Sequence, residues 1–219
     1  MSVFSTDSDI LRFEPSLFGD LYFQWQVLSL GHDGQLESTV FSSATGNFIT
    51  NAVQVGGVIY LKDPDGTLEG MYEITAVNSE MELTISVLRQ SQSDAPVQVG
   101  LAADLYYRIG TYAPQSYDVM YELTQYFGIQ PGNAESEYKA EDIYNKDVLR
   151  QASTHAVIAG VYATLASAAD DADGYWKKSL YYQGLFEKAR ERCRLSIDQG
   201  NDGVSDRTII GGSIRLIRD

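Results

Sequence analysis

Met71-Tyr-Glu-Ile-Thr-Ala-Val77 is followed, after Asn78-Ser-Glu80, by Met81-Glu-Leu-Thr-Ile-Ser-Val-Leu88. From Leu83 to Val87 aliphatic residues alternate with hydroxyl residues, a period of two that is typical of a half-buried strand. The short polar segment between the two runs predicts a turn, so we expect the stretch to fold as a β-hairpin. The middle of this 219-residue chain is therefore expected to be a β-structure.

Short β-prone runs continue on both sides of this hairpin. They lie at residues 39–41, 53–55, 58–61 and 101–109. Asp63-Pro-Asp-Gly66, between the run at 58–61 and the hairpin, is a strong turn signal. Five or so short antiparallel strands in about 70 residues predict a small barrel or curled sheet over residues 35–108.

Apolar residues spaced three and four apart predict helices before and after the β module. Residues 7–28 are expected to form two short helices, interrupted at Pro15 and ended by Gly31-His-Asp-Gly34. Further helices are expected at residues 116–127, 146–169 and 175–197. A short loop joins the last two, which predicts an antiparallel helical hairpin.

Together these elements predict an α+β fold with a discontinuous helical bundle. Residues 1–34 and 109–200 are expected to form the bundle, and the β module of residues 35–108 is inserted into it. Residues 201–219 are expected to form an extended C-terminal docking tail.

Asp198-Gln-Gly-Asn-Asp-Gly-Val-Ser-Asp206 ends the helical region, and the last run of the tail, residues 207–219, follows it. It mixes branched apolar residues with arginines and has no turn that would fold it back on itself. A terminal strand presents unpaired N–H and C=O groups and needs a partner strand, either in its own chain or in a neighbouring one. The residues predicted to bind a partner chain are Arg207, Ile209, Ile210, Ile214, Arg215, Leu216, Ile217 and Arg218.

The composition is that of an ordered, acidic protein. Hydrophobic residues make up 44% and charged residues 21%, and 16 basic against 30 acidic residues leave a formal charge of −14. Such a charge disfavours the wrapping of nucleic acid and docking on an anionic membrane. The first residues lack a signal-peptide pattern and no apolar run reaches membrane-spanning length, so a soluble protein made in the cytosol is expected.

The charge is unevenly distributed along the chain. Residues 177–194 hold six basic and two acidic residues, whereas residues 35–108 hold nine acidic and three basic residues. The basic helix is explained either by the helix dipole and a solvated face, or by contact with an acidic surface of the next subunit. The basic excess is too small to indicate DNA binding.

No sequence motif of an enzyme active site or phosphate loop is present. His32 lies beside Asp33 in a Gly-rich turn and His155 lies in the middle of a helix, and neither position is a catalytic arrangement. The single Cys193 excludes an intrachain disulfide and a thiolate zinc site made by one chain, and is expected to be a small core residue. No catalytic residue, cofactor or metal site is predicted.

One loop partly follows a calcium-binding pattern. Asp198, Asp202 and Asp206 occupy its first, fifth and ninth positions. The third position is Gly200 and the twelfth is Ile209, where a calcium loop needs oxygen ligands. A polar linker after a helix is therefore favoured over a calcium site.

Three parts of the chain together resemble the head–tail connector (adaptor) proteins of tailed bacteriophages. The first is the opening Thr6–Pro15 helix, and the second is the closing block of residues 175–190, 198–206 and 214–218. The third is the β module from Phe48 to Ile85, which is similar to small barrel modules of phage structural proteins. The likeness covers most of the chain.

The resemblance implies a homo-oligomeric ring, commonly of twelve subunits, beneath the portal protein at the head–tail junction of the virion. It implies C-terminal segments that reach the portal, contact with a downstream neck or tail protein, and a bore that passes DNA without sequence-specific binding. It also implies a structural protein that needs no cofactor. An acidic wall suits such a conduit, because it does not grip the like-charged duplex.

Other functions stay open at this point. The β module also fits a stopper, neck or tail-completion protein. A carbohydrate- or receptor-binding module is the alternative from another class, since acidic β domains rich in Tyr and Trp bind sugars, and this chain has 15 Tyr and 2 Trp. A hydrolase comes third.

Overall fold

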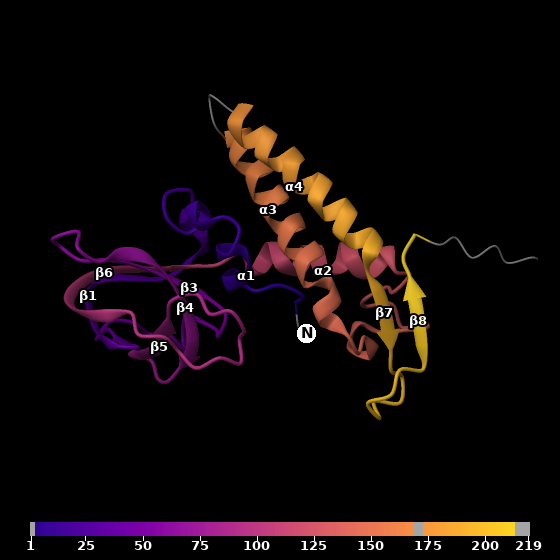
Figure 1. Cartoon of the computed structure of the whole chain (residues 1–219), viewed down its shortest axis with the longest axis horizontal. Coiled ribbons are helices and arrows are strands. Elements are labelled where there is room, and N and C mark those ends of the chain that lie inside the picture. Colours follow the sequence, from indigo (N-terminus) through magenta and orange to yellow (C-terminus); the bar gives the residue numbers. More distant parts are fainter. Residues whose placement is uncertain (1–2, 169–172, 213–219) are drawn as a thin grey trace, which may run out of the picture. The chain divides into compact units, whose positions relative to one another are not determined.

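The chain folds into helices and strands that form two compact units (Figure 1). The computed structural model describes residues 3–168 and 173–212. One unit is Thr6–Tyr112, called the barrel unit here, and the other is Met1–Ser5 with Ala113–Asp219, called the helical unit. The mixed α+β class predicted from the sequence is confirmed.

Six antiparallel strands close into a barrel, in the order β1, β2, β5, β4, β3, β6. Their bounds are β1 Val27–Ser38, β2 Val40–Ser42, β3 Val58–Lys62, β4 Glu69–Val77, β5 Glu82–Ser86 and β6 Gly100–Gly110. The predicted hairpin is the β4–β5 pair, with Ile74 opposite Ile85. The small antiparallel barrel is therefore confirmed, although residues 53–55 form no strand.

Aliphatic and aromatic side chains fill the interior of the barrel. The rings of Phe41, Phe48 and Tyr107 contact one another at centroid distances of 5.1, 6.1 and 6.2 Å. The Tyr107 hydroxyl lies 3.0 Å from the Ser43 hydroxyl and 3.4 Å from that of Ser29. The buried phenol is thus hydrogen-bonded, as burial of its polar tip requires.

The first strand begins earlier than the sequence predicts. Where a helix end and a Gly-rich turn were expected, β1 runs on as one 12-residue strand. It pairs with β6 along its length through several register shifts. Gly31 serves close packing here, because a Cβ at this position would lie 2.6 Å from the Tyr107 ring. Residues 6–34 and 109–112, which the predicted boundaries placed with the helices, therefore belong to the barrel unit.

Three short helical pieces precede the barrel: α1 Asp7–Leu11, η1 Pro15–Leu17 and η2 Gln24–Gln26. The predicted interruption at Pro15 is confirmed, since this proline is the first residue of η1. The Asp9 carboxylate accepts the Thr6 N–H at 2.9 Å, which satisfies a donor at the start of α1. The helix packs on β3 and β4.

A buried ion pair joins β4 to the segment after β5. Arg89 Nη2 donates to Glu73 Oε1 at 2.9 Å and Nε donates to Oε2 at 3.3 Å. The two side chains are only 7% and 1% exposed. Arg89 Nη1 also donates to the carbonyl oxygens of Gln92 and Asp94, at 3.0 and 2.5 Å. One guanidinium thus fixes the loop that leads towards β6.

Arg89→Met is expected to lower the free energy of unfolding of the barrel unit by about 3 to 5 kcal/mol, because Glu73 keeps a buried charge without its partner. Urea unfolding followed by circular dichroism measures the loss. Glu73→Gln combined with Arg89→Met removes the stranded charge and should recover part of the stability. A loss under about 1 kcal/mol in the single variant would contradict the burial of the pair.

Asp7 is a buried carboxylate at the point where the chain enters and leaves the barrel unit. Its Oδ1 accepts the N–H of Tyr112, the last residue of the unit, at 2.8 Å. Burial raises the pKa of Asp7 from 3.8 to about 6, and the hydrogen bond from Tyr112 opposes this rise. Asp7 is therefore a carboxylate that costs stability when it ionises.

The stability that Asp7 contributes is fully present below its unfolded pKa of 3.8 and is lost as the pH rises through about 6. The loss amounts to about 3 kcal/mol. Asp7→Asn keeps an oxygen acceptor for Tyr112 and removes the titration. Its stability relative to the wild type should therefore rise by this amount from about pH 4 to about pH 7.5 in urea unfolding. Burial also lowers the pKa of His155. Because His155 is present in both proteins, its contribution cancels in the difference between their free energies of unfolding. A difference that does not change with pH would contradict the prediction.

The helical unit contains three longer helices, α2 Ala113–Tyr126, α3 Arg150–Ala168 and α4 Asp173–Arg192. Two short turns, η3 Ala140–Asp142 and η4 Lys146–Leu149, lie between α2 and α3. The predicted hairpin is confirmed, because α3 and α4 pack along each other, and α2 packs on α3 (Figure 1).

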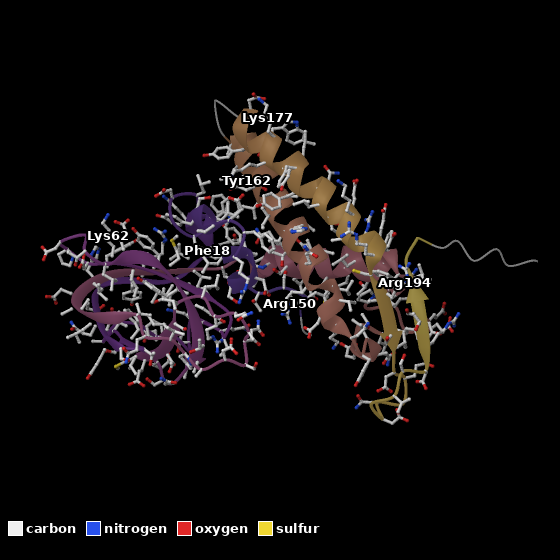
Figure 2. All side chains as sticks on the ribbon, in the orientation of Figure 1. Phe18, Lys62, Arg150, Tyr162, Lys177 and Arg194 are labelled. Carbon is white, nitrogen blue, oxygen red and sulfur yellow. The ribbon has the colours of Figure 1, made fainter. Side chains whose placement is uncertain are left out.

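Tyr162 of α3 is fully buried at the contact with α4 (labelled in Figure 2). Its ring stacks with those of Tyr175 and Tyr182 at centroid distances of 6.1 and 6.4 Å. Lys178 Nζ donates to its hydroxyl at 2.9 Å. Ser179 Oγ donates to the Ala159 carbonyl at 2.9 Å, which shows how closely the two helices approach. Within the described residues, no helix combines the length and apolarity needed to cross a membrane.

Candidate functional site

The helix predicted to reach Ile197 ends at Arg192, and a β-hairpin follows it. β7 Arg194–Ile197 pairs antiparallel with β8 Arg207–Ile210. Leu195 and Ile197 are fully buried and alternate with more exposed residues, which is the period of a strand and not of a helix. Four residues of the predicted extended tail are thus a strand of the chain's own fold.

β7 is also held along its second edge. The Tyr144 N–H donates to the Ser196 carbonyl at 2.8 Å. The Asn145 side chain accepts the Ser196 N–H at 2.7 Å and donates to the Arg194 carbonyl at 2.9 Å. β7 therefore lies between the segment around Asn145 and β8, and β8 forms the outer strand.

The register decides which groups β8 presents outwards. Opposed residues in an antiparallel pair alternate between hydrogen-bonded and non-hydrogen-bonded pairs. Ser196 directs its N–H and C=O to Asn145 and Tyr144, so its pair with Thr208 is of the non-hydrogen-bonded kind. The Thr208 N–H and C=O consequently face away from β7. No further strand pairs with β8 in the part of the chain that the structure describes.

The predicted partner-binding residues have different surroundings. Arg207 Nη1 donates to the Tyr138 hydroxyl at 2.6 Å and lies 3.2 Å from Glu137 Oε1, so this side chain is used within its own chain. Ile209 is half-buried opposite Leu195, and Ile210 is 51% exposed. The other five, Ile214, Arg215, Leu216, Ile217 and Arg218, lie outside the described residues.

Two glycines directly after β8 let the backbone contact the end of α2 closely. A Cβ on Gly211 would lie 2.0 Å from Tyr126 Cε1, a distance that no side chain tolerates. Gly212 has a φ of +71° and donates its N–H to the Tyr126 carbonyl at 3.2 Å. The Arg190 guanidinium lies 4.2 Å from the Tyr126 ring centroid. The path of the chain after β8 is therefore fixed by the end of α2 and by α4.

The sequence predicted the strand character of residues 207–210 but not the groups that hold it. Asn145 carries no sequence signal, because its role depends on a strand 50 residues later. The Gly-Gly pair was a readable signal, since adjacent glycines mark a close backbone approach.

The connection between β7 and β8 is a self-bonded polar loop. The Asp198 carboxylate accepts the N–H groups of Asp202 and Gly203 at 3.2 and 2.8 Å. Asp206 Oδ2 accepts the Gln199 N–H at 2.9 Å. Asp202 Oδ1 accepts the Val204 N–H at 2.9 Å, so all three aspartates of the calcium pattern bind backbone, and no group of three metal ligands occurs among the described residues.

The remaining chemical candidates occupy structural positions. His32 is exposed, and the neighbouring Asp33 accepts hydrogen bonds from Ser43 and Thr45. His155 is buried, and burial lowers its pKa. Cys193 is buried, donates to the Val148 carbonyl at 3.1 Å, and has a pKa raised by burial, which confirms the expected core thiol.

The two units differ in formal charge. The barrel unit has fourteen acidic and four basic residues, a formal charge of −10. Arg89 and Arg108 are buried, and the Arg108 guanidinium carbon lies 3.5 Å from the centroid of the Tyr22 ring. Lys62 forms an ion pair with Glu69 at 3.0 Å. Exposed Lys188 and Arg192 lie on α4 of the helical unit.

Gly211→Ala is expected to displace residues 207–212 from α2, because the new methyl group overlaps the Tyr126 ring, at a cost of about 1 to 3 kcal/mol. The hydrogen-exchange rates of the β8 amides should therefore rise. Gly160→Ala is the matched control, since its Cβ meets nothing within 4 Å on a helix, and should stabilise the chain by up to about 1 kcal/mol. Unchanged exchange in Gly211→Ala would contradict the contact.

No family model, no curated protein and no solved structure matches this chain. Its function is therefore to be inferred from the outer strand of the hairpin, the grouping of its side chains and the distribution of its charge.

Proposed function

We propose that this chain is a structural, non-enzymatic virion protein, a head–tail connector (adaptor) of a tailed bacteriophage. In this proposal copies of the chain form a ring beneath the portal, and their helices form a discontinuous bundle around the channel. Residues 201–219 of each copy dock on a partner through β8 and the segment that follows it. A downstream neck or tail protein binds the other side of the ring.

The observation that carries the proposal is the outer edge of β8. Thr208 directs its N–H and C=O away from β7, the only strand that pairs with β8 among the described residues, and an edge of this kind is a template for strand addition. Charged side chains or a covering segment usually protect such an edge. Here Thr208 is exposed, and the next residues in the sequence combine two arginines with three branched apolar residues. This composition suits a segment that binds a partner protein.

The charge of the chain supports the conduit. A formal charge of −14 creates a surface that repels duplex DNA at short range, within about 8 Å at physiological salt. A wall of this kind passes a genome without holding it.

One observation favours glycan binding by the barrel unit as a second candidate function. Trp25 is 76% exposed and its ring stacks on Phe23 with 4.9 Å between centroids. Tyr22, Tyr60 and Arg108 line a small pocket that also includes Phe23. Exposed aromatic faces of this kind bind sugar rings. Glycan-array binding that is lost in Trp25→Ala would establish this function.

The experiment for the connector uses the portal protein of the same phage, co-expressed with the full chain. Thr208→Pro removes the outward N–H of β8 and leaves the bonds between β7 and β8 intact, since proline is tolerated on the free edge of a strand. Portal binding in affinity capture is expected to fall at least tenfold. A portal complex in Thr208→Pro equal to that of the wild type would refute docking through this edge.

Thr208→Val is the matched control, because it keeps the N–H and the strand conformation and removes only the hydroxyl. It should bind the portal as the wild type does. Ile209→Pro removes an N–H that faces β7, and its lower melting temperature would show that the hairpin register is the one described.

A further inference from the structure

We propose that copies of this chain associate head to tail, with the outer ridge of α4 in one copy seated on an acidic groove of the barrel in the next. This inference deepens the proposed ring by naming the two surfaces that build it. The occupant of the groove is a second copy of the same chain.

The groove lies on the outer wall of the barrel, across β6, β1, β2 and β5, and encloses about 690 Å³. Glu37 of β1 lies opposite Leu101 of β6 and opposite Val40 of β2. Glu82 of β5 lies opposite Ser42 in the adjoining row. Two carboxylates thus alternate with two apolar side chains on neighbouring strands.

Two apolar side chains of this groove are exposed to solvent. Leu101 is 83% exposed and Val40 is 38% exposed. No basic residue lines the groove, so nothing in its own wall neutralises Glu37 and Glu82. An apolar floor with uncompensated negative charge is complementary to a partner surface that combines apolar and basic side chains.

The outer face of α4 has this combination. Trp176, Leu180, Gly184, Lys188 and Arg192 follow one another at intervals of four, so they form a single ridge along the helix. Trp176 is 50% and Leu180 49% exposed, and both basic residues are exposed. The ridge is apolar in its first half and basic in its second. Gly184 between them has no side chain, and the space beside it is open, since a Cβ there would meet nothing within 4 Å.

The two surfaces lie on different units of one chain, so each copy offers one of each. In the head-to-tail arrangement each pair of neighbours makes the contact once, so the interface is heterologous and its repetition gives a closed ring or an open filament; two copies that exchanged both contacts would instead form a two-fold dimer. Trp176 is the residue type that carries most of the binding energy in protein interfaces when it enters an apolar pocket. The charges around it fix the partner and the register.

Two double variants of the full chain remove one surface each. Glu37→Lys/Leu101→Ser disables the groove, and Trp176→Ala/Lys188→Glu disables the ridge. All four side chains are exposed, so both variants should keep the circular dichroism and melting temperature of the wild type. Each is expected to weaken self-association about 30-fold or more in sedimentation velocity.

Mixing the variants gives the decisive result. An equimolar mixture retains one intact groove and one intact ridge, so it should form a complex of twice the monomer mass and nothing larger. The wild type should form larger closed species at about 100 µM. A mixture that stays monomeric, a single variant that assembles like the wild type, or a wild type that is monomeric at this concentration would each overturn the proposal.

Matched controls change similar side chains outside the two surfaces. Asp65→Lys reverses a charge in the exposed β3–β4 turn, and Tyr144→Ala removes an aromatic ring that is 59% exposed outside α4. Both should assemble as the wild type does. Neither double variant touches Thr208, so portal capture of a monomeric variant would separate a failure of this contact from a failure of the connector proposal.

Discussion

The pairing of β1 with β6 is the constraint on which the barrel depends. These two strands, of 12 and 11 residues, are the longest of the sheet, and they pair over nearly their whole length. Their register shifts coincide with Gly31, Gly34 and the positive φ of Asp104, so the two strands bend instead of extending flat. Closure leaves the barrel without a free strand edge. In β8 of the helical unit, by contrast, the backbone N–H and C=O of Thr208 face away from β7.

The sequence predicted the elements whose signals are local. The alternation in β5, the interruption at Pro15 and the apolar spacing of α3 each depend on near neighbours in the chain, and each led to the correct element. The errors occurred where a distant segment decides the conformation. Gly31 and Gly34 read as a turn in isolation, and only the Tyr107 ring and the Leu105 side chain opposite them show that they are strand positions.

The same division applies to the candidate site. The sequence indicated that residues 207–210 are strand-forming, but it placed Arg207 at a partner, and the structure pairs this side chain with Glu137 and Tyr138. Asn145 could not be predicted, because an asparagine that satisfies a strand 50 residues away looks like any loop residue. The charge contrast between the two units was visible in the sequence.

The hydrogen bond between Asp7 and Tyr112 has a consequence for how such a chain changes over evolution. The barrel unit starts at Thr6 and ends at Tyr112. The bond joins Asp7, its second residue, to Tyr112, its last, so the two ends of the unit lie side by side. A module whose ends meet can be removed or exchanged in a single genetic event, since a short connection closes the gap at little entropic cost. The N-terminal residue Ser5 stays with the helices through Ser153, at 2.7 Å between hydroxyls. Exchange or removal of the barrel unit therefore need not break the contact between Ser5 and the helices.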